Sequence, residues 1–473
     1  MRKGLAVFVA MLALFGGAAS ASADAQPNVV MIMLDDATAA DAAFMPNVQS
    51  ELAGQGTTFS NSFVSFSLCC PSRTTYLTGR YAHNTGVGAN HNGYSHFDPT
   101  YTLATWLHDA GYHTGFVGKY LNGYGKGDQL AVPPGWDDWH ADLSSTESAV
   151  LDYDLAENGA LVQYGSDPSD YKGDVITQRA LDFLRSSSAT QPFYLNVAYQ
   201  VPHHGSPDYS GGACFHTAQP DSQDLGSHAD VPLPEDPSFN EADVSDKPAA
   251  VAALPSLVPR AIAKITKRYR CRLDSLLSAD RGVDQIIAEL EAEGRLADTL
   301  ILFTSDNGWM QGEHRIANGK VVPYEPSIRV PLIVRGPGFA EGVTASAPAA
   351  NIDYAPTILR ATGVAATGHE PDGVPLQDVA AGLYPDRDIA LESFLDTKRS
   401  FGFQGVRTPN YAYLEYADGE RELYDLAADP YELDNRAGDP GYAEAEAWLH
   451  QRTADLAACS GASCVLTGDP PPP

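Results

Sequence analysis

The sequence predicts an α/β fold built on a large, mixed but mostly parallel β-sheet with helices on its faces. Apolar, β-branched runs of strand length alternate with segments whose apolar residues recur at helical spacing, and this alternation is typical of parallel sheets. Residues 28–34 and 299–304 are apolar almost throughout and end in acidic residues, as expected for strands that are buried on both faces. The chain shows no internal repeat.

The predicted elements follow one another in order along the chain. The expected strands of the sheet are residues 28–34, 113–117, 193–199 and 299–304. The expected helices between them are residues 102–110, stopped by Gly111, residues 175–184, and a helix around residues 283–290 that is closed by Gly294.

Two regions depart from this pattern. Residues 205–260 are rich in Pro, Gly, Ser and Asp, and a loop of that length inside a domain is usually functional or disordered. Beyond about residue 385, short strands at 389–394 and 411–416 precede a helix around Trp448 and a Pro-rich tail. The sequence therefore predicts a large domain over residues 24–385 and a small α+β domain over residues 386–473.

The N-terminus has the composition of an export signal. Arg2 and Lys3 precede an apolar segment, residues 5–15, which is followed by small residues at 21–23. This pattern predicts a signal peptide over residues 1–23 and a secreted, extracytoplasmic protein. An uncleaved anchor is the alternative, but Gly and Ser residues interrupt the apolar run, which is too short to span a bilayer.

Composition excludes several classes of partner. The 473 residues include 60 acidic and 30 basic side chains, for a net charge of -30, and 44% are hydrophobic, as in a packed globular protein. Such an acidic chain is not expected to bind nucleic acid or an anionic membrane, since both need a basic face. An anionic substrate would have to be held by a local cluster of cations.

Six cysteines are present, and export makes disulfides permissible. Cys459 and Cys464 are close enough for a small local loop, and Cys214 and Cys271 flank the irregular segment and could join its ends. Cys69 and Cys70 are adjacent, a geometry that rarely allows a disulfide. At least one of these two is expected to have another role, with a redox-active pair as one alternative.

Acidic and amide side chains follow two of the predicted strands. Asp35 and Asp36 end the first, and Asp306 and Asn307 end the last; ligands bind outside the carboxyl ends of such strands. Two carboxylates about 4 Å apart repel by roughly 4 kcal/mol at an effective dielectric near 20, so the cluster needs a cation or a shared proton. Oxygen ligands favour Ca²⁺ or Mg²⁺. The alternative is a helix cap and a turn.

Residues 69–80, CCPSRTTYLTGR, are the most specific segment of the sequence. They resemble the signature of the sulfatase family, Cys-x-Pro-Ser-Arg followed by Leu-Thr-Gly, with Cys69 in first place. The resemblance implies an alkaline-phosphatase-like fold and oxidation of Cys69 to Cα-formylglycine by a formylglycine-generating enzyme. The form of the motif, with Lys119 to Asn122, is closest to N-acetylglucosamine-6-sulfatases and related glycan sulfatases.

Other elements of the family occur in the same order from residue 27 to residue 435. By the resemblance, Lys119, His203 and Lys320 contact the sulfate group, and Arg73 holds the modified side chain. Asp35, Asp36, Asp306, Asn307 and the modified Cys69 would bind a divalent cation, Ca²⁺ or Mg²⁺. The large domain would be catalytic, with residues 205–260 on the substrate side.

One position departs from the family pattern. Many sulfatases have a His two or three residues after the first lysine, where this chain has Leu121 and Asn122. Asn122 can hydrogen-bond a substrate but cannot act as a base. His83 and His314 are candidate substitutes at the substrate, although a lone His is more often a surface or core residue. His203 is the candidate acid for the leaving group, because imidazole titrates near neutral pH.

The sequence thus favours a secreted, cation-dependent sulfatase that hydrolyses a sulfate monoester of a sugar or an aryl alcohol. The hydrated aldehyde at position 69 would be its nucleophile. A phosphate or phosphonate monoester hydrolase on the same scaffold is the enzymatic alternative. A non-catalytic protein that binds sulfated glycans, with Cys69 unmodified, is the alternative of another class.

Overall fold

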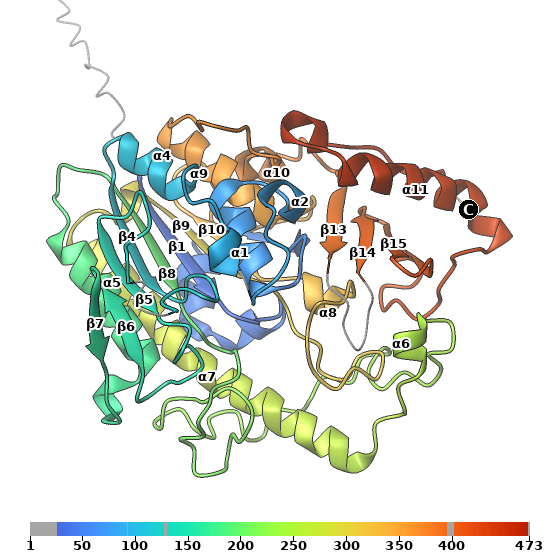
Figure 1. Ribbon diagram of the computed structural model, residues 1–473, viewed down its shortest axis with the longest axis horizontal. Coiled ribbons are helices and arrows are strands. Elements are labelled where there is room, and N and C mark those ends of the chain that lie inside the picture. Colours follow the sequence, from blue (N-terminus) through green and yellow to red (C-terminus); the bar gives the residue numbers. More distant parts are fainter. Residues whose placement is uncertain (1–25, 92, 127–129, 395–401, 472–473) are drawn as a thin grey trace, which may run out of the picture.

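The computed structural model describes residues 26–91, 93–126, 130–394 and 402–471 (Figure 1). The predicted signal peptide, residues 1–23, lies outside these residues. No helix in the described part of the chain combines the length and the apolar character that crossing a membrane requires.

A ten-stranded mixed sheet forms the centre of the molecule, which confirms the predicted fold class. Its order is β11 (Val343–Ala345), β2 (Thr57–Phe59), β10 (Leu332–Arg335), β9 (Thr299–Ser305), β1 (Asn28–Leu34), β8 (Phe193–Ala198), β4 (His113–Gly118), β5 (Asp138–Asp142), β6 (Asp154–Glu157) and β7 (Ala160–Gln163). The five central strands from β9 to β5 are parallel, whereas β10, β6 and β7 run antiparallel to their neighbours. The four strands predicted for the sheet are therefore all present, within one or two residues of the expected bounds.

Helices cover both faces of this sheet (Figure 1). One face packs against α1 (Cys69–Thr78), α4 (Leu103–Asp109), α9 (Tyr354–Thr362) and α10 (Leu376–Ala380). The other packs against α5 (Lys172–Ser186) and α7 (Pro259–Ala292). Successive side chains of β1 pack alternately in the two hydrophobic cores, with Met31 in the first and Ile32 in the second. This double burial explains why β1 is apolar at every position.

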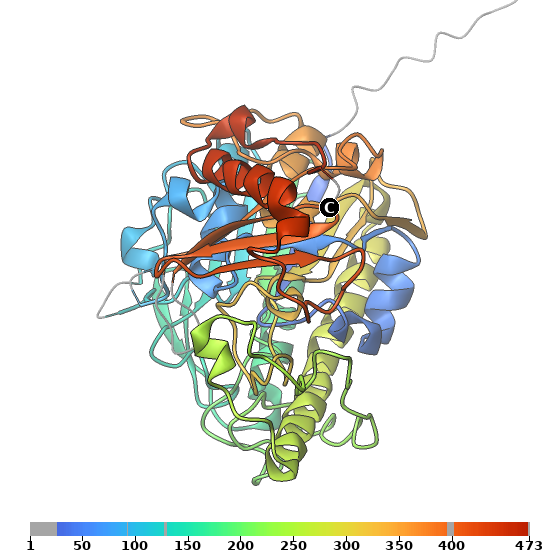
Figure 2. The ribbon, with the colours of Figure 1, turned by 90° about the vertical axis from the view of Figure 1, so that its right-hand side faces the viewer.

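A second, antiparallel sheet contains β13 (Ile389–Ser393), β14 (Phe403–Arg407), β15 (Tyr411–Tyr416) and β16 (Arg421–Asp425). The amphipathic helix α11 (Ala443–Ala457) lies along this sheet (Figure 2). These elements match the α+β region expected after residue 385. Their core continues into the larger part of the chain, since Tyr81 and Tyr324 pack in the same cluster as Leu423.

Residues 205–260 are irregular, as expected, and their only complete helix among the described residues is the short α6 (Ala249–Ala252). The disulfide Cys214–Cys271 joins this segment to α7, and Cys459–Cys464 closes a short loop near the C-terminus. Both pairs agree with the sequence, and Cys69 and Cys70 are free. Helix α7 is 34 residues long and begins far ahead of the residues that predicted it.

Candidate active site

The ends of four neighbouring strands place the predicted site residues together. In the order β9-β1-β8-β4, each strand is parallel to the next, so their carboxyl ends share one edge. Asp306 follows β9, Asp35 and Asp36 follow β1, His203 follows β8 after a short turn, and Lys119 follows β4. The sequence alone predicted the strand ends, and the sheet order makes them adjacent.

Cys69 is the first residue of α1, and its buried thiol lies within this cluster. The Sγ atom is 3.0 Å from Lys320 Nζ, 3.6 Å from Lys119 Nζ and 3.6 Å from Asp35 Oδ1. All ten residues of α1 are buried. Pro71 fits in the first turn because amide groups there have no partner within the helix.

Three basic side chains neutralise the three buried carboxylates. Lys119 donates to Asp35, Lys320 donates to Asp36, and Arg73 Nε donates to Asp306 Oδ2 over 2.8 Å. Burial alone would raise the pKa of Asp35 and Asp36, but nearby positive charge outweighs it and lowers both pKa values, chiefly that of Lys119 for Asp35 and of Lys320 for Asp36, with His203 contributing to each. Burial and the neighbouring Asp35 raise the pKa of Asp306.

The backbone at Asp36 has an unusual conformation, with φ = 73° in the left-handed region that non-glycine residues seldom occupy. Its amide donates to Asp306 Oδ1 over 3.2 Å, and Arg272 donates to its carbonyl oxygen over 2.6 Å. Asp36 Oδ2 is buried and has no hydrogen-bond partner among the described residues. Strain and an unsatisfied carboxylate oxygen are typical of a functional site.

This arrangement fits a hard divalent cation. Ligand atoms of Asp35, Asp36 and His203 lie within 4.8 Å of one another, as do those of Asp35, Cys69 and Asp306. Asn307 lies beside them: its Nδ2 donates to Asp36 Oδ1 over 2.7 Å, and its Oδ1 accepts from Lys320 over 3.2 Å. The unpaired oxygen of Asp36 completes an oxygen-rich set that suits Ca²⁺ or Mg²⁺.

His203 lies at the edge of the cluster, with Nε2 3.9 Å from Asp36 Oδ2. Its Nδ1 is 3.0 Å from the carbonyl oxygen of His204, which places the Nδ1 proton in that bond and leaves Nε2 facing the site. Burial lowers the pKa of His203 to about 4, with the nearby lysines adding to the effect and the carboxylates opposing it. A sulfate anion beside Nε2 would favour the protonated ring in the same way as these carboxylates do.

Family comparison identifies the chain. The model of the sulfatase family matches residues 27–364, and a second model, described as the C-terminal part of N-sulphoglucosamine sulphohydrolase, matches residues 312–458. The chain belongs to the sulfatase family. It is accordingly a sulfuric ester hydrolase.

Relatives of this sulfatase span nearly its whole length. Human N-acetylglucosamine-6-sulfatase is 32% identical over 98% of the chain and 90% of the human protein. An arylsulfatase of Volvox carteri is 32% identical over 97% of the chain and 79% of the algal protein. A solved structure described as a complex with its substrate D-glucosamine-2-N,6-O-disulfate has a TM-score of 0.76 at 24% identity, over 91% of this chain and 97% of that one.

Three side chains that were predicted to act at the substrate form their hydrogen bonds with residues outside the cluster of carboxylates and lysines. Asn122 donates to Glu147 Oε1 over 2.8 Å and lies 3.3 Å from Cys70 Sγ. His83 contacts Glu392 and the carbonyl oxygen of Cys459 through its two ring nitrogens. His314 is fully buried, with Nδ1 2.6 Å from Glu241 Oε2. Within the described residues, none of the three forms a hydrogen bond with Cys69, and their roles at the substrate stay predictions.

Two residues of the site were not predicted from the sequence. Buried Arg272 donates to the carbonyl oxygens of Asp36 and Pro202 and so supports both sides of the sulfatase site. Its position was readable, because residues 265, 269, 272 and 276 recur at helical spacing and place Arg272 on the buried face of α7. Glu147 binds Asn122 from a segment with no recognisable pattern in the sequence.

Proposed function

We propose that this sulfatase is a secreted enzyme that hydrolyses sulfate monoesters of sugars, with a formylglycine made from Cys69 and a bound Ca²⁺ or Mg²⁺. The placement of Cys69 carries the proposal, because its Sγ lies between Lys119 and Lys320 and beside Asp35. Relatives named N-acetylglucosamine-6-sulfatase and a similar structure holding a sulfated glucosamine support the sugar. Relatives named extracellular sulfatases support export.

The unmodified thiol is a poor nucleophile in this environment. Burial, together with Asp35 and Asp306, raises the pKa of Cys69 to about 12 despite the two lysines. The thiol is then protonated at neutral pH, whereas attack requires the thiolate. A hydrated aldehyde at this position would supply two geminal hydroxyls. One would attack sulfur as the S–O bond to the alcohol breaks and the alcohol leaves, and loss of the proton of the other would expel sulfate and regenerate the carbonyl.

Asp35, Asp36, Asp306 and Asn307 would hold the divalent cation. When bound, it supplies Lewis-acid charge that favours ionisation of a hydroxyl and neutralises the sulfate oxygens. Arg73 fixes Asp306 and, through its bond to the carbonyl of Lys119, the strand end that carries this lysine. The chain's own residues thus fix the ligand geometry before substrate arrives.

Sulfate recognition falls to the two lysines and the start of α1. A sulfate monoester is an anion in a protein of net charge -30, so its charge must be balanced locally. Lys119 and Lys320 both reach the position of Cys69 Sγ, and the N-terminus of α1 adds a positive dipole there. These charges stabilise the transition state as charge develops on the sulfate oxygens.

Phosphonate or phosphate ester hydrolysis is the second candidate. The structure of phosphonate monoester hydrolase from Agrobacterium radiobacter has a TM-score of 0.69 at 21% identity, over 91% of this chain and 95% of that one. At that identity the likeness shows the fold alone. The fold therefore admits both types of ester.

Activity measurements separate these functions. The full chain, produced together with a formylglycine-generating enzyme, is assayed on D-glucosamine 6-sulfate, 4-nitrophenyl sulfate, 4-nitrophenyl phosphate and a phosphonate monoester. We expect kcat/KM to be highest on the sulfates. A preference for the phosphorus esters would favour the second candidate, and binding of glucosamine 6-sulfate without turnover would favour a non-catalytic glycan-binding protein.

His203→Ala tests whether this imidazole protonates the leaving group. On a sugar sulfate, whose alcohol is a poor leaving group, we expect kcat/KM to fall by about 10²–10⁴-fold. On 4-nitrophenyl sulfate the loss should be much smaller, because nitrophenolate leaves without protonation. His204→Ala is the control, since it removes the neighbouring imidazole but keeps the carbonyl that positions His203. Equal losses on the two substrates would exclude the acid role.

A further inference from the structure

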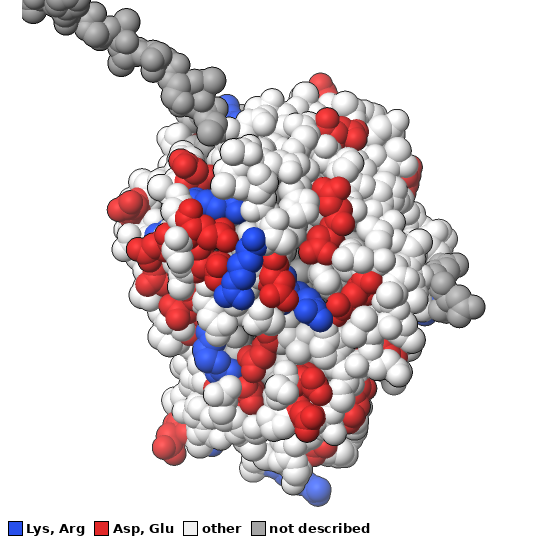
Figure 3. Space-filling model, turned by 90° about the vertical axis from the view of Figure 1, so that its left-hand side faces the viewer, with Lys and Arg blue, Asp and Glu red and all other residues white. Residues whose placement is uncertain are grey.

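The N-terminal half of α7 is strongly basic in an otherwise acidic protein. Arg260, Lys264, Lys267, Arg268 and Arg270 lie within eleven residues, and no Asp or Glu occurs from residue 247 to residue 273, although the chain has a net charge of -30. We call these five side chains the α7 basic stripe. By contrast, the face of the molecule seen in Figure 3 carries many acidic side chains with fewer basic ones between them.

The stripe faces away from the core. Ile265 and Tyr269 are buried in the core on one side of α7. Residues 260, 264 and 267, which recur at helical spacing, lie on the other side and are exposed. Among the described residues, the ion pairs in which α7 supplies the cation involve Arg272 and Arg281. The charges of the stripe therefore lack a described carboxylate partner.

Neutral groups make the remaining contacts of the stripe. Lys267 Nζ donates to the carbonyl oxygen of Gly212 over 2.7 Å, and Arg270 Nε donates to that of Val231 over 2.9 Å. Arg268 Nε is buried without a hydrogen-bond partner in the described part of the chain. Hydrogen bonds from Ser210 and Gly212 lower the pKa of the Asp208 carboxyl, and the charge of Lys267 adds to their effect. Carbonyl contacts orient the stripe without neutralising it, and no ion pair within the described residues involves these five side chains, so an anion can bind them.

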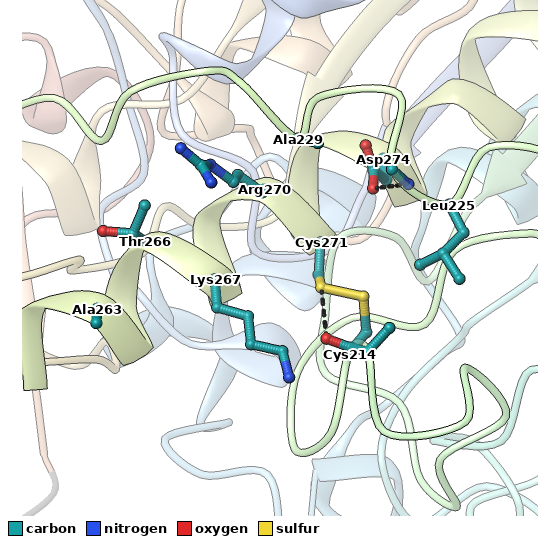
Figure 4. A pocket seen from close by; sticks show the side chains of 11 residues that line it. Cys214, Leu225, Ala229, Ala263, Thr266, Lys267, Arg270, Cys271 and Asp274 are labelled. Atoms are coloured by element: carbon teal, nitrogen blue, oxygen red, sulfur yellow. Dashed lines mark hydrogen bonds between the residues drawn. A yellow bond between two sulfur atoms is a disulfide. The ribbon is translucent and has the colours of Figure 1, made fainter. Parts of the chain in front are cut away.

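A hollow of about 530 Å³ lies beside the stripe, between α7 and the irregular segment (Figure 4). Lys267, Arg270 and the disulfide Cys214–Cys271 line it. Asp274 also lies there, but its oxygens accept hydrogen bonds from the amides of Gly226 and His228 and lie 3.0 Å from the His228 ring. With this carboxylate satisfied, the hollow presents two cations to a ligand.

The C-terminal end of the stripe, at Arg270, is close in sequence to a residue that supports the catalytic site. Arg272, two residues beyond it, donates to the carbonyl oxygen of Asp36. At a rise of 1.5 Å per residue, the stripe extends about 15 Å along α7 from that end. A substrate long enough to span this distance is needed to contact both places at once, and a monosaccharide is too short.

We infer that the α7 basic stripe binds a sulfated polysaccharide chain outside the catalytic site, so that the enzyme holds a polymeric substrate at two places. The inference rests on the proposed function for its choice of polyanion. The sulfates of such a polymer are repeated along its length, as the cations are along the stripe. Because the rest of the chain is acidic and repels a polyanion, the stripe is where a polyanion can approach.

Binding is measured with fluorescein-labelled heparin in the inactive Cys69→Ala background, where no hydrolysis occurs. Adding Lys264→Gln, Lys267→Gln and Arg268→Gln should weaken binding about tenfold or more at 0.1 M salt, and reduce the slope of log affinity against log salt by about two to three. The control is Arg185→Gln, Arg360→Gln and Arg436→Gln, which removes the same charge from exposed, ion-paired positions and should change neither. Unchanged heparin binding in the stripe variant would overturn the inference.

Kinetics in the active protein distinguish this site from the catalytic one. The stripe variant should raise KM for sulfate release from heparin and leave kcat/KM on D-glucosamine 6-sulfate unchanged. Equal losses on both would overturn the inference, as would tighter binding of a 20-base-pair DNA than of heparin. If no sulfated sugar is hydrolysed but the stripe variant still loses heparin, the proposed function fails and the binding site stands.

Discussion

Cys69→Ala is expected to abolish sulfatase activity while the protein stays folded. The variant loses the atom from which the aldehyde is made, and the hydrated aldehyde is the proposed nucleophile, so kcat should fall by about 10⁴-fold or more. Folding should survive, because replacing this thiol removes little volume and the three ion pairs around it remain. Turnover and unfolding temperature are measured on the same preparation.

Cys70→Ala is the matched control, since it removes a second buried, free thiol next to the first. Cys70 Sγ accepts from the amide of Asn122 over 3.1 Å and lies outside the cluster of carboxylates and lysines. This variant should keep most of its activity, and its peptide should still show a loss of about 18 Da at Cys69, as replacement of a thiol by an aldehyde requires. A wild-type protein that turns over at full rate with an intact Cys69 thiol would refute the mechanism, and loss of both thiols together would indicate a redox pair.

The local sequence was sufficient to predict the strands that carry the site, because a strand that is buried on both faces is apolar at consecutive positions. Residues 28–34 are the strand in the structure, with the expected acids directly after it. Sequence could not show that Asp36 and Asp306 meet, since they are 270 residues apart and their contact depends on the order of the strands. The rule that ligands bind at the carboxyl ends of parallel strands suggested that grouping, and the family resemblance implied it as well.

Side chains whose partners are distant in sequence were the hardest to interpret. His83 was a candidate for a role at the substrate, but Glu392, 309 residues away, lies 2.8 Å from its Nδ1. Helix α7 was predicted only near residues 283–290, because the basic residues at 260–272 obscure the apolar stripe formed by Ile265, Tyr269 and Leu273. For His83 the deciding interaction is tertiary and no local pattern reports it, whereas for α7 the apolar pattern is local but is interrupted by basic residues.

Lys320→Met is expected to weaken catalysis and strengthen cation binding at the same time. Its ammonium group donates to Asp36 and to Asn307 Oδ1, two of the proposed cation ligands, and lies 3.0 Å from Cys69 Sγ. Two unit charges 4 Å apart interact by about 4 kcal/mol at an effective dielectric of 20, so this lysine opposes a cation bound nearby. Calorimetric titration should show Ca²⁺ affinity at least about tenfold higher in the variant. Loss of a charge that faces the sulfate should lower kcat/KM by about 10²–10³-fold.

Thermal unfolding with and without Ca²⁺ gives a readout that does not depend on activity. Without the ion, Lys320→Met leaves Asp36 buried and unpaired, which typically costs about 3–5 kcal/mol, so the unfolding temperature should fall. Adding Ca²⁺ should restore it, and the increment should exceed that of the wild type, whose lysines already neutralise the carboxylates. Lys247→Met removes another buried lysine, whose ion pairs are with Glu241 and Asp246 and not with the proposed cation ligands, and should lower the unfolding temperature without enlarging the Ca²⁺ increment. An equal increment in Lys320→Met and the wild type would mean that Lys320 and the cation do not share these carboxylates, and the proposed ligand set would then be wrong.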